Sequence, residues 1–265
     1  MAFRFDTIIP SPADARDWKY GHTTSNVCAA APIAPAPTAT PPATLDLRPS
    51  LYPVRNQGQE GACAGFSSAA MREWQERGVC LSYFAPDFIY WNRPDTTQTG
   101  MCLRDVMNIL LKTGVCPESD CPYGTISATS NISKTAYSDA LNHKITGYAQ
   151  VTSQDDLKAA LIADGPNVIV FPVYNNGSAF WKPATDNQAI VGYHAVAVVG
   201  YDQYGYLIRN SWGPTWNHNG YTTYPYADWG SHTEIWSTVS ATPAPVEVVI
   251  QPVVTPASGC LCGWF

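Results

Sequence analysis

The sequence predicts an α+β protein with two unlike lobes. Apolar residues recur at helical spacing in the first half of the chain, whereas the pattern beyond about Tyr123 favours strands. The chain has 265 residues, of which 45% are hydrophobic and 14% charged, so it can form one large domain or two fused lobes with their own cores. We expect a helical lobe at about residues 45–122 and a β lobe at about residues 123–239, with ligands bound in the groove between them.

The first lobe is predicted to be organised around a helix that starts at a cysteine. Small or apolar residues recur at Phe66, Ala70 and Trp74, which share one face of a helix. This helix is expected to run from Cys63 to about Arg77, before Gly78. Two more helices are expected: one capped by Ser82 that carries Phe84, Phe88 and Trp91, and one that presents Leu103, Met107, Leu110 and Leu111 and ends at Gly114.

The second lobe is predicted to consist mainly of strands. The expected strands cover residues 144–151, 167–174, 193–201, 204–209 and 220–224. One capped helix is expected between Ser153 and Asp164.

The stretch Gln57–Ser67 places Cys63 at the start of the first helix. Gly58 and Gly61 allow the backbone to turn tightly just before the cysteine. The unpaired backbone N–H groups and the positive end of the helix dipole favour an anion there, so the sulfur can be held as a thiolate. Taken alone, a cysteine at a helix start is more often a buried packing residue.

Two downstream motifs favour a catalytic role for this cysteine. His194 lies in an apolar run 131 positions after Cys63, and Asn210 opens Asn-Ser-Trp-Gly 147 positions after it. Both separations fall within the range typical of papain-type enzymes. Each residue alone also fits a structural role, because buried histidines and turn asparagines are common.

Together these motifs resemble the papain-like cysteine protease family, and the departures from its usual pattern resemble a bacterial branch. Gln57, six residues before Cys63, occupies the position of the family's glutamine, and the resemblance covers roughly residues 45–239. It implies a papain-like two-lobe fold, with an α-helical left lobe, an antiparallel β-barrel-like right lobe and the active site in the cleft between them. It also implies a cysteine-type endopeptidase that hydrolyses peptide bonds through a thiolate–imidazolium pair and an acyl-enzyme intermediate.

The resemblance implies a role for each matching residue. Cys63 would attack the scissile carbonyl, and His194 would protonate the leaving amine and then activate water. Asn210 would orient the imidazole, and Trp212 would cover that hydrogen bond from water. The side-chain amide of Gln57 and the backbone N–H of Cys63 would form the oxyanion hole.

Several positions depart from the family's pattern. Glu60 stands where the family has a bridged cysteine, which implies that one core disulfide is absent, and Ala64 replaces a tryptophan beside the nucleophile. The substrate-binding residues implied by the resemblance are Gly100 and Met101 on the cleft rim, and Leu103, Val170 and Tyr193 in the pocket for the second residue on the acyl side. An apolar or aromatic preference is expected in that pocket.

Residues 1–44 are expected to form a pro-like segment and a Pro/Ala-rich linker. Papain-like proteases are generally made as zymogens with an N-terminal segment in the cleft. We expect residues 1–27 to dock on the catalytic unit and partly cover its cleft, with Trp18 and Phe5 as anchors. An ordinary packing arm or a disordered tail is the alternative.

Composition excludes several kinds of partner. The net charge of −6 and the lack of a basic cluster argue against nucleic acid and anionic membranes, and no apolar run approaches the roughly 18 residues of a membrane-spanning helix. The first ten residues lack the apolar core of a secretory signal, so a secreted or cell-surface location needs another export route or a signal already removed. We expect a monomer that acts on proteins or peptides, with residues 240–265 as a Pro/Val-rich tail or, alternatively, a packed strand.

The cysteines leave their pairing open. Of eight cysteines, seven remain without Cys63, so at least one stays free or pairs between chains if the others are oxidised. Cys116 and Cys121 are candidates to pair with each other or with Cys80 and Cys102. The C-terminal Cys-Leu-Cys lacks the spacing of a zinc site, and we expect no metal and no cofactor.

Two functional classes follow. The favoured one is an active cysteine peptidase. The alternative is a non-catalytic papain-fold relative that binds a peptide or a partner in the same groove. The presence of Cys63, His194, Asn210 and Gln57 together argues against the alternative, because a binding module has no need of all four.

Overall fold

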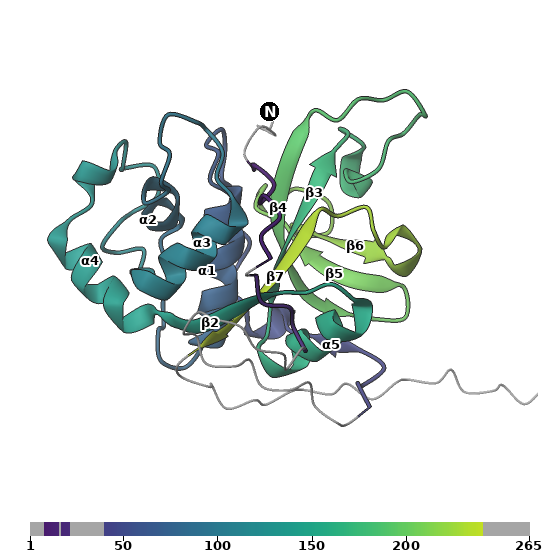
Figure 1. Cartoon of the computed structure of the whole chain (residues 1–265), viewed down its shortest axis with the longest axis horizontal. Coiled ribbons are helices and arrows are strands. Elements are labelled where there is room, and N and C mark those ends of the chain that lie inside the picture. Colours follow the sequence, from purple (N-terminus) through teal and green to yellow (C-terminus); the bar gives the residue numbers. More distant parts are fainter. Residues whose placement is uncertain (1–7, 16, 22–39, 241–265) are drawn as a thin grey trace, which may run out of the picture.

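Helices α1 to α4 lie on one side of the molecule, and most of the strands lie on the other side together with helix α5 (Figure 1). The computed structural model describes residues 8–15, 17–21 and 40–240. The expectations for Phe5, for most of the linker and for the tail beyond residue 240 therefore lie outside the described residues. The helices are α1 (Cys63–Gln75), α2 (Pro86–Trp91), α3 (Leu103–Lys112), α4 (Lys134–Ala140) and α5 (Gln154–Ala163). The strands are β1 (Leu45–Asp46), β2 (Ile145–Gln150), β3 (Asn167–Val173), β4 (Gly192–Tyr201), β5 (Gly205–Arg209), β6 (Tyr221–Pro225) and β7 (Glu234–Ser240).

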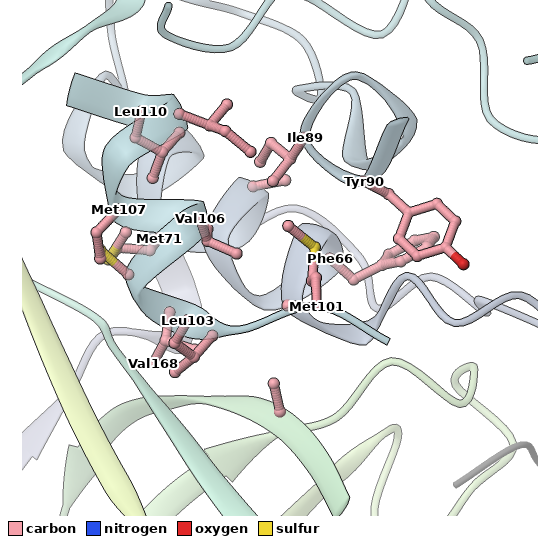
Figure 2. Packing of buried hydrophobic residues seen from close by; sticks show 14 of the residues in the cluster. Phe66, Met71, Ile89, Tyr90, Met101, Leu103, Val106, Met107, Leu110 and Val168 are labelled. Carbon is pink, nitrogen blue, oxygen red and sulfur yellow. The ribbon is translucent and has the colours of Figure 1, made fainter. Parts of the chain in front are cut away.

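Helix α1 lies between helices α2 and α3 and the sheet. All 13 of its residues are buried, because it packs against α2 on one side and against β3 and β4 on the other. The approach to α2 requires a glycine: a Cβ at Gly65 would lie 2.6 Å from the carbonyl oxygen of Pro86. Figure 2 shows the core between the three helices, with Phe66 and Met71 of α1 facing residues of α2 and α3. No helix of the described residues has the length and apolar character to cross a membrane.

Helix α2 starts later than the sequence predicted. Its first residue is Pro86 and its N-cap is Ala85, so the expected cap at Ser82 is wrong. Proline suits the first turn because its fixed φ is helical and its missing N–H would have no partner there. The chain just before is extended, since Phe84 forms an antiparallel bridge with Pro117.

The second lobe is one antiparallel sheet in the order β2-β7-β3-β4-β5-β6, with β1 on β4. The two-lobe α+β fold is the one that the sequence predicted, and the described strands of the second lobe form an open sheet that ends at β2 and β6 and does not close into a barrel. Strands β3 and β4 pair from Asn167 opposite Val198 to Val173 opposite Gly192, and every residue of β3 is buried. This pairing sets His194 opposite Phe171, at the side of the sheet that meets α1.

An N-terminal arm, the described residues 8–15 and 17–21, runs between the two lobes (Figure 1). At one end, Ile8 forms a parallel bridge with Met101, and the N–H of Ile9 donates to the carbonyl of Met101 at 3.2 Å. At the other end, the backbones of Trp18 and Tyr20 bond to Gln150 of β2, each at 2.8 Å. The arm is therefore held by backbone contacts to both lobes.

Candidate active site

Cys63 is the first residue of α1 and is fully buried. Its N-cap, Ala62, offers no side-chain hydrogen bond, so no capping side chain takes up the N–H groups of the first turn. The backbone N–H of Ala195 in β4 donates to Cys63 Sγ at 3.4 Å. The sulfur therefore contacts the backbone of the residue that directly follows His194 in β4.

His194 is held by an amide whose orientation is fixed. Its Nε2 lies 2.8 Å from Asn210 Oδ1, and the backbone N–H of Ser211 donates to the same oxygen at 2.7 Å. Because an amide oxygen only accepts, Nε2 of His194 is the donor and the neutral ring carries its proton there. The other ring nitrogen, Nδ1, is buried and has no hydrogen-bond partner among the described residues, so it is the atom available to a thiol proton.

Aromatic rings seal this histidine from water. The ring of Trp212 stacks on His194 with centroids 4.6 Å apart and planes 20° apart. Phe180 packs edge-on against the histidine at 5.7 Å. The hydrogen bond between His194 and Asn210 is thus enclosed by apolar surface, where an electrostatic interaction is stronger than in water.

Gln57 lies on the loop that leads into α1 and is 2% exposed. Its Nε2 donates to the carbonyl of Glu60 at 3.0 Å, and its Oε1 accepts from the hydroxyl of Ser211 at 2.6 Å. The neighbouring Asn56 forms an antiparallel bridge with Trp212. A short ribbon of residues 55–57 and 211–213 therefore ties the two lobes together beside Cys63.

A network of charges supports the lobe junction behind Asn210. Arg55 bonds to Glu73 of α1 at 3.2 Å and to Glu118 at 2.7 Å. Burial raises the pKa of Glu73, and the guanidinium of Arg55 opposes that rise. Arg55, Glu73 and Arg209 line a small cavity that reaches Asn210 and Ser211.

Four of the residues expected to bind substrate lie in or against the buried cluster that contains Cys63. Met101, Leu103 and Val170 belong to the buried cluster that contains the cysteine, and Tyr193 packs against it half-buried. Gly100 is buried beside Met101. Ile8 of the arm is 4% exposed and belongs to the same cluster, so the arm fills part of this space.

Burial dominates the electrostatics of the histidine. Desolvation lowers the pKa of His194 to about 4, although its hydrogen bond to Asn210 acts in the opposite direction. The arrangement with the arm in place thus favours a neutral imidazole.

A second shifted group is the carboxyl of Asp87, in the first turn of α2. Burial and the nearby Glu60 raise the pKa of Asp87 to about 7.

The sequence reasoning missed two residues of the site. Ser211 belongs to the Asn-Ser-Trp-Gly motif, and its place directly after Asn210 was the signal that it bonds within the site. Phe180 comes from a loop outside every motif, and no sequence signal pointed to it.

The five described cysteines, Cys63, Cys80, Cys102, Cys116 and Cys121, form no disulfide bond, and the described residues hold no metal-binding group of His, Cys, Asp and Glu. The pairing of Cys116 and Cys121, with each other or with Cys80 and Cys102, stays a prediction.

A helix-borne thiol beside a strand-borne histidine and asparagine, at the junction of a helical and a β lobe, is the arrangement of papain-like cysteine proteases. The chain belongs to this family, since residues 41–241 match the papain family cysteine protease.

Several known members are similar in sequence or structure. Xylellain, a cysteine protease from Xylella fastidiosa, has a crystal structure that superposes with a TM-score of 0.74 at 28% identity, covering 90% of this chain and 98% of that one. Cysteine proteinase 3 of Entamoeba histolytica is 27% identical over 75% of this chain and 65% of its own length. Mexicain of Jacaratia mexicana is 28% identical over 68% of this chain and 86% of its own length. This chain thus spans just under two thirds of the amoebal relative.

Proposed function

We propose that this chain is a cysteine endopeptidase whose peptidase domain occupies residues 45–239. The observation that supports it most is the position of Cys63 Sγ, 3.4 Å from the N–H of Ala195 and beside a histidine oriented by Asn210. The helix terminus and the Ala195 N–H both favour the thiolate, the form that attacks carbon.

In the proposed reaction, the thiolate of Cys63 attacks the carbonyl carbon of the scissile peptide bond. His194 gives a proton to the leaving amine, which departs as the C–N bond breaks and a thioester forms. His194 then takes a proton from water, whose oxygen attacks the thioester and releases the acid product and the thiol. Asn210 keeps the ring in place throughout, because its Oδ1 accepts from Nε2.

The oxyanion hole is proposed to form from the N–H of Cys63 and the side-chain amide of Gln57. One N–H of that amide is engaged by the carbonyl of Glu60, which leaves the second to donate to the substrate oxygen. Fixed donors of this kind stabilise the developing negative charge without reorganising.

Peptides are the proposed substrates, bound in extended form along Gly100 and Met101. The apolar side chains of Leu103, Val170 and Tyr193 line the proposed pocket for the second residue on the acyl side. Cleavage of a peptide library by the activated enzyme tests this assignment. Enrichment of apolar or aromatic residues two positions before the cut supports it, and enrichment of charged residues there contradicts it.

The N-terminal arm is proposed to hold the enzyme in a covered state. Ile8 forms a backbone bridge with Met101, and the N–H of Ile9 donates to the carbonyl of Met101, to which an extended substrate would bind. Ser11 contacts both Cys102 and the N–H of Arg104, whose guanidinium pairs with Asp17 of the arm. Trp18, an expected anchor, packs half-buried against the core of the β lobe, which supports the proposal.

The covered state is also proposed to weaken the thiolate. Cys63 and His194 are both fully buried with the arm in place, and burial lowers the pKa of His194 to about 4. A neutral imidazole cannot stabilise a neighbouring thiolate by charge, so the pair rests uncharged. Departure of the arm admits water and lets the imidazolium form.

Rates of peptide hydrolysis test both parts of the proposal. We expect hydrolysis by a variant that begins near Ala43 to be much faster than hydrolysis by the full chain, and Cys63→Ala to abolish it in either background. Equal rates for the two chain lengths would remove the covering role of the arm. Peptide binding without any hydrolysis dependent on Cys63 would favour the non-catalytic alternative.

A further inference from the structure

We propose that Ser211 is a positioning residue for the oxyanion hole: its hydroxyl fixes the amide of Gln57 so that an N–H, and not the carbonyl oxygen, faces the reacting carbonyl. This inference rests on the proposed peptidase function. Ser211 is 6% exposed and follows Asn210 directly, at the edge of the β lobe that meets the loop before α1.

The hydroxyl determines which way the amide of Gln57 points. Ser211 Oγ donates to Gln57 Oε1 at 2.6 Å, while Gln57 Nε2 donates to the carbonyl of Glu60 at 3.0 Å. The two contacts hold opposite ends of one planar group. With the oxygen and one N–H engaged, the second N–H is the group left to meet a substrate oxygen.

The backbone of Ser211 contacts both Asn210 and Gln57. Its N–H donates to Asn210 Oδ1 at 2.7 Å, and its carbonyl accepts from the N–H of Gln57 at 2.8 Å. One residue therefore contacts both the residue that orients His194 and the proposed oxyanion donor. The two branches are chemically separable, because only the hydroxyl is lost when serine becomes alanine.

Loss of the hydroxyl changes the balance between the two orientations of the amide. Gln57 Oε1 would be left in a buried place without its donor, which costs free energy in the observed orientation. Rotation of the Gln57 amide by 180° would move Oε1 away from that place, but it would also turn the lone pairs of this oxygen toward the developing oxyanion. Both outcomes raise the barrier for acylation, whereas neither touches the thiolate of Cys63.

The test compares two reactions of the same sulfur in full-length chains at a pH low enough to release the arm. Ser211→Ala is expected to lower kcat/KM for a peptide substrate about tenfold, mainly through kcat, since a single hydrogen bond is lost. Alkylation of Cys63 by iodoacetamide needs the thiolate but develops no oxyanion, so its rate should stay within about twofold. Ser211→Thr, which keeps a hydroxyl, should restore most of the hydrolysis.

A double-mutant cycle with Gln57→Ala gives the sharper result. If Ser211 acts through Gln57, adding Ser211→Ala to Gln57→Ala should cost almost nothing further. A second full tenfold loss in that background, or equal losses of hydrolysis and alkylation in Ser211→Ala, would overturn the assignment and indicate a general structural role. A parent chain with no hydrolysis dependent on Cys63 at that pH, and none when it begins near Ala43, would instead contradict the proposed peptidase.

Discussion

The backbone N–H of Ala195 donates to Cys63 Sγ at 3.4 Å. This contact joins the first residue of α1 to the strand that carries His194, so the two lobes meet at the proposed reacting atom. Hydrogen bonds to an ionised acceptor are about twice as strong as those between neutral groups, so this N–H favours the thiolate over the thiol. Once the arm leaves, the helix terminus and the strand therefore both favour the anionic sulfur, one from each lobe.

Removal of the oxyanion donor should slow the chemistry without harming the fold. We expect Gln57→Ala to lower kcat by about 10²–10³-fold, because loss of one such donor typically has that effect. Gln59→Ala is the matched control, since Gln59 is exposed on the same loop. Steady-state kinetics on a peptide substrate measure the difference. Similar kcat values for the two variants would show that Gln57 gives no donor to the transition state.

A disulfide between the arm and the rim should lock the enzyme. Ser11 Oγ lies 3.1 Å from Cys102 Sγ, so Ser11→Cys is expected to form a disulfide with Cys102 on mild oxidation. The oxidised variant should lose peptidase activity, and a reductant should restore it. The wild-type chain and Ser11→Cys combined with Cys102→Ser, treated identically, control for oxidation of Cys63. Full activity in the oxidised, cross-linked variant would contradict a covering arm.

Acid should favour release of the arm. Burial lowers the pKa of His194 to about 4 from an ordinary 6.5, so the covered state binds fewer protons than a state with a solvated ring. The covered state therefore loses stability relative to the open one as pH falls from about 6.5 toward 4. Tryptophan fluorescence and peptidase onset, followed against pH, measure the transition.

One other histidine could mimic that transition. The pKa of His232 is also lowered to about 4 by burial, and its protonation would destabilise the aromatic core of the β lobe. His232→Gln removes this contribution, so a transition caused by His194 should persist in that variant. Loss of the transition in His232→Gln would assign it to the core.

Asp87, in the first turn of α2, should make the folded protein less stable as pH rises. Burial raises the pKa of Asp87 from 3.8 to about 7, so the folded protein binds a proton that the unfolded chain has lost. This group's contribution is present below about pH 4 and is lost as pH rises to about 7. Asp87→Asn should remove that slope from thermal unfolding, while Asn at the exposed Asp95 should not. An unchanged slope in Asp87→Asn would contradict the protonated carboxyl.

Much of the site could be predicted from sequence because its chemistry depends on local motifs. The thiol sits on a helix whose start is marked by glycines, and the spacing to His194 and Asn210 is typical of papain-type enzymes. The partners of Gln57 could not be predicted in the same way. These partners depend on which residue of 55–57 lies opposite which residue of 211–213. The packing of the two lobes determines that alignment.

The strand that the sequence reasoning missed has a physical explanation. Strand β7 buries polar residues as well as apolar ones: Ser237 and Thr238 are fully buried next to Ile235 and Trp236. Thr238 bonds to Gln75 of α1, so its polarity is satisfied inside the core. The alternation of polar and apolar residues that marks a half-exposed strand is therefore absent.

The alkylation rate of Cys63 by iodoacetamide at pH 5 to 6 tests the central claim most directly. A variant that begins near Ala43 should react far faster than free cysteine, because its thiolate persists below the ordinary thiol pKa of about 8.5. The full chain should react more slowly than that variant while the arm covers the sulfur. A rate for the shortened variant no greater than that of free cysteine would contradict the thiolate, and with it the proposed peptidase.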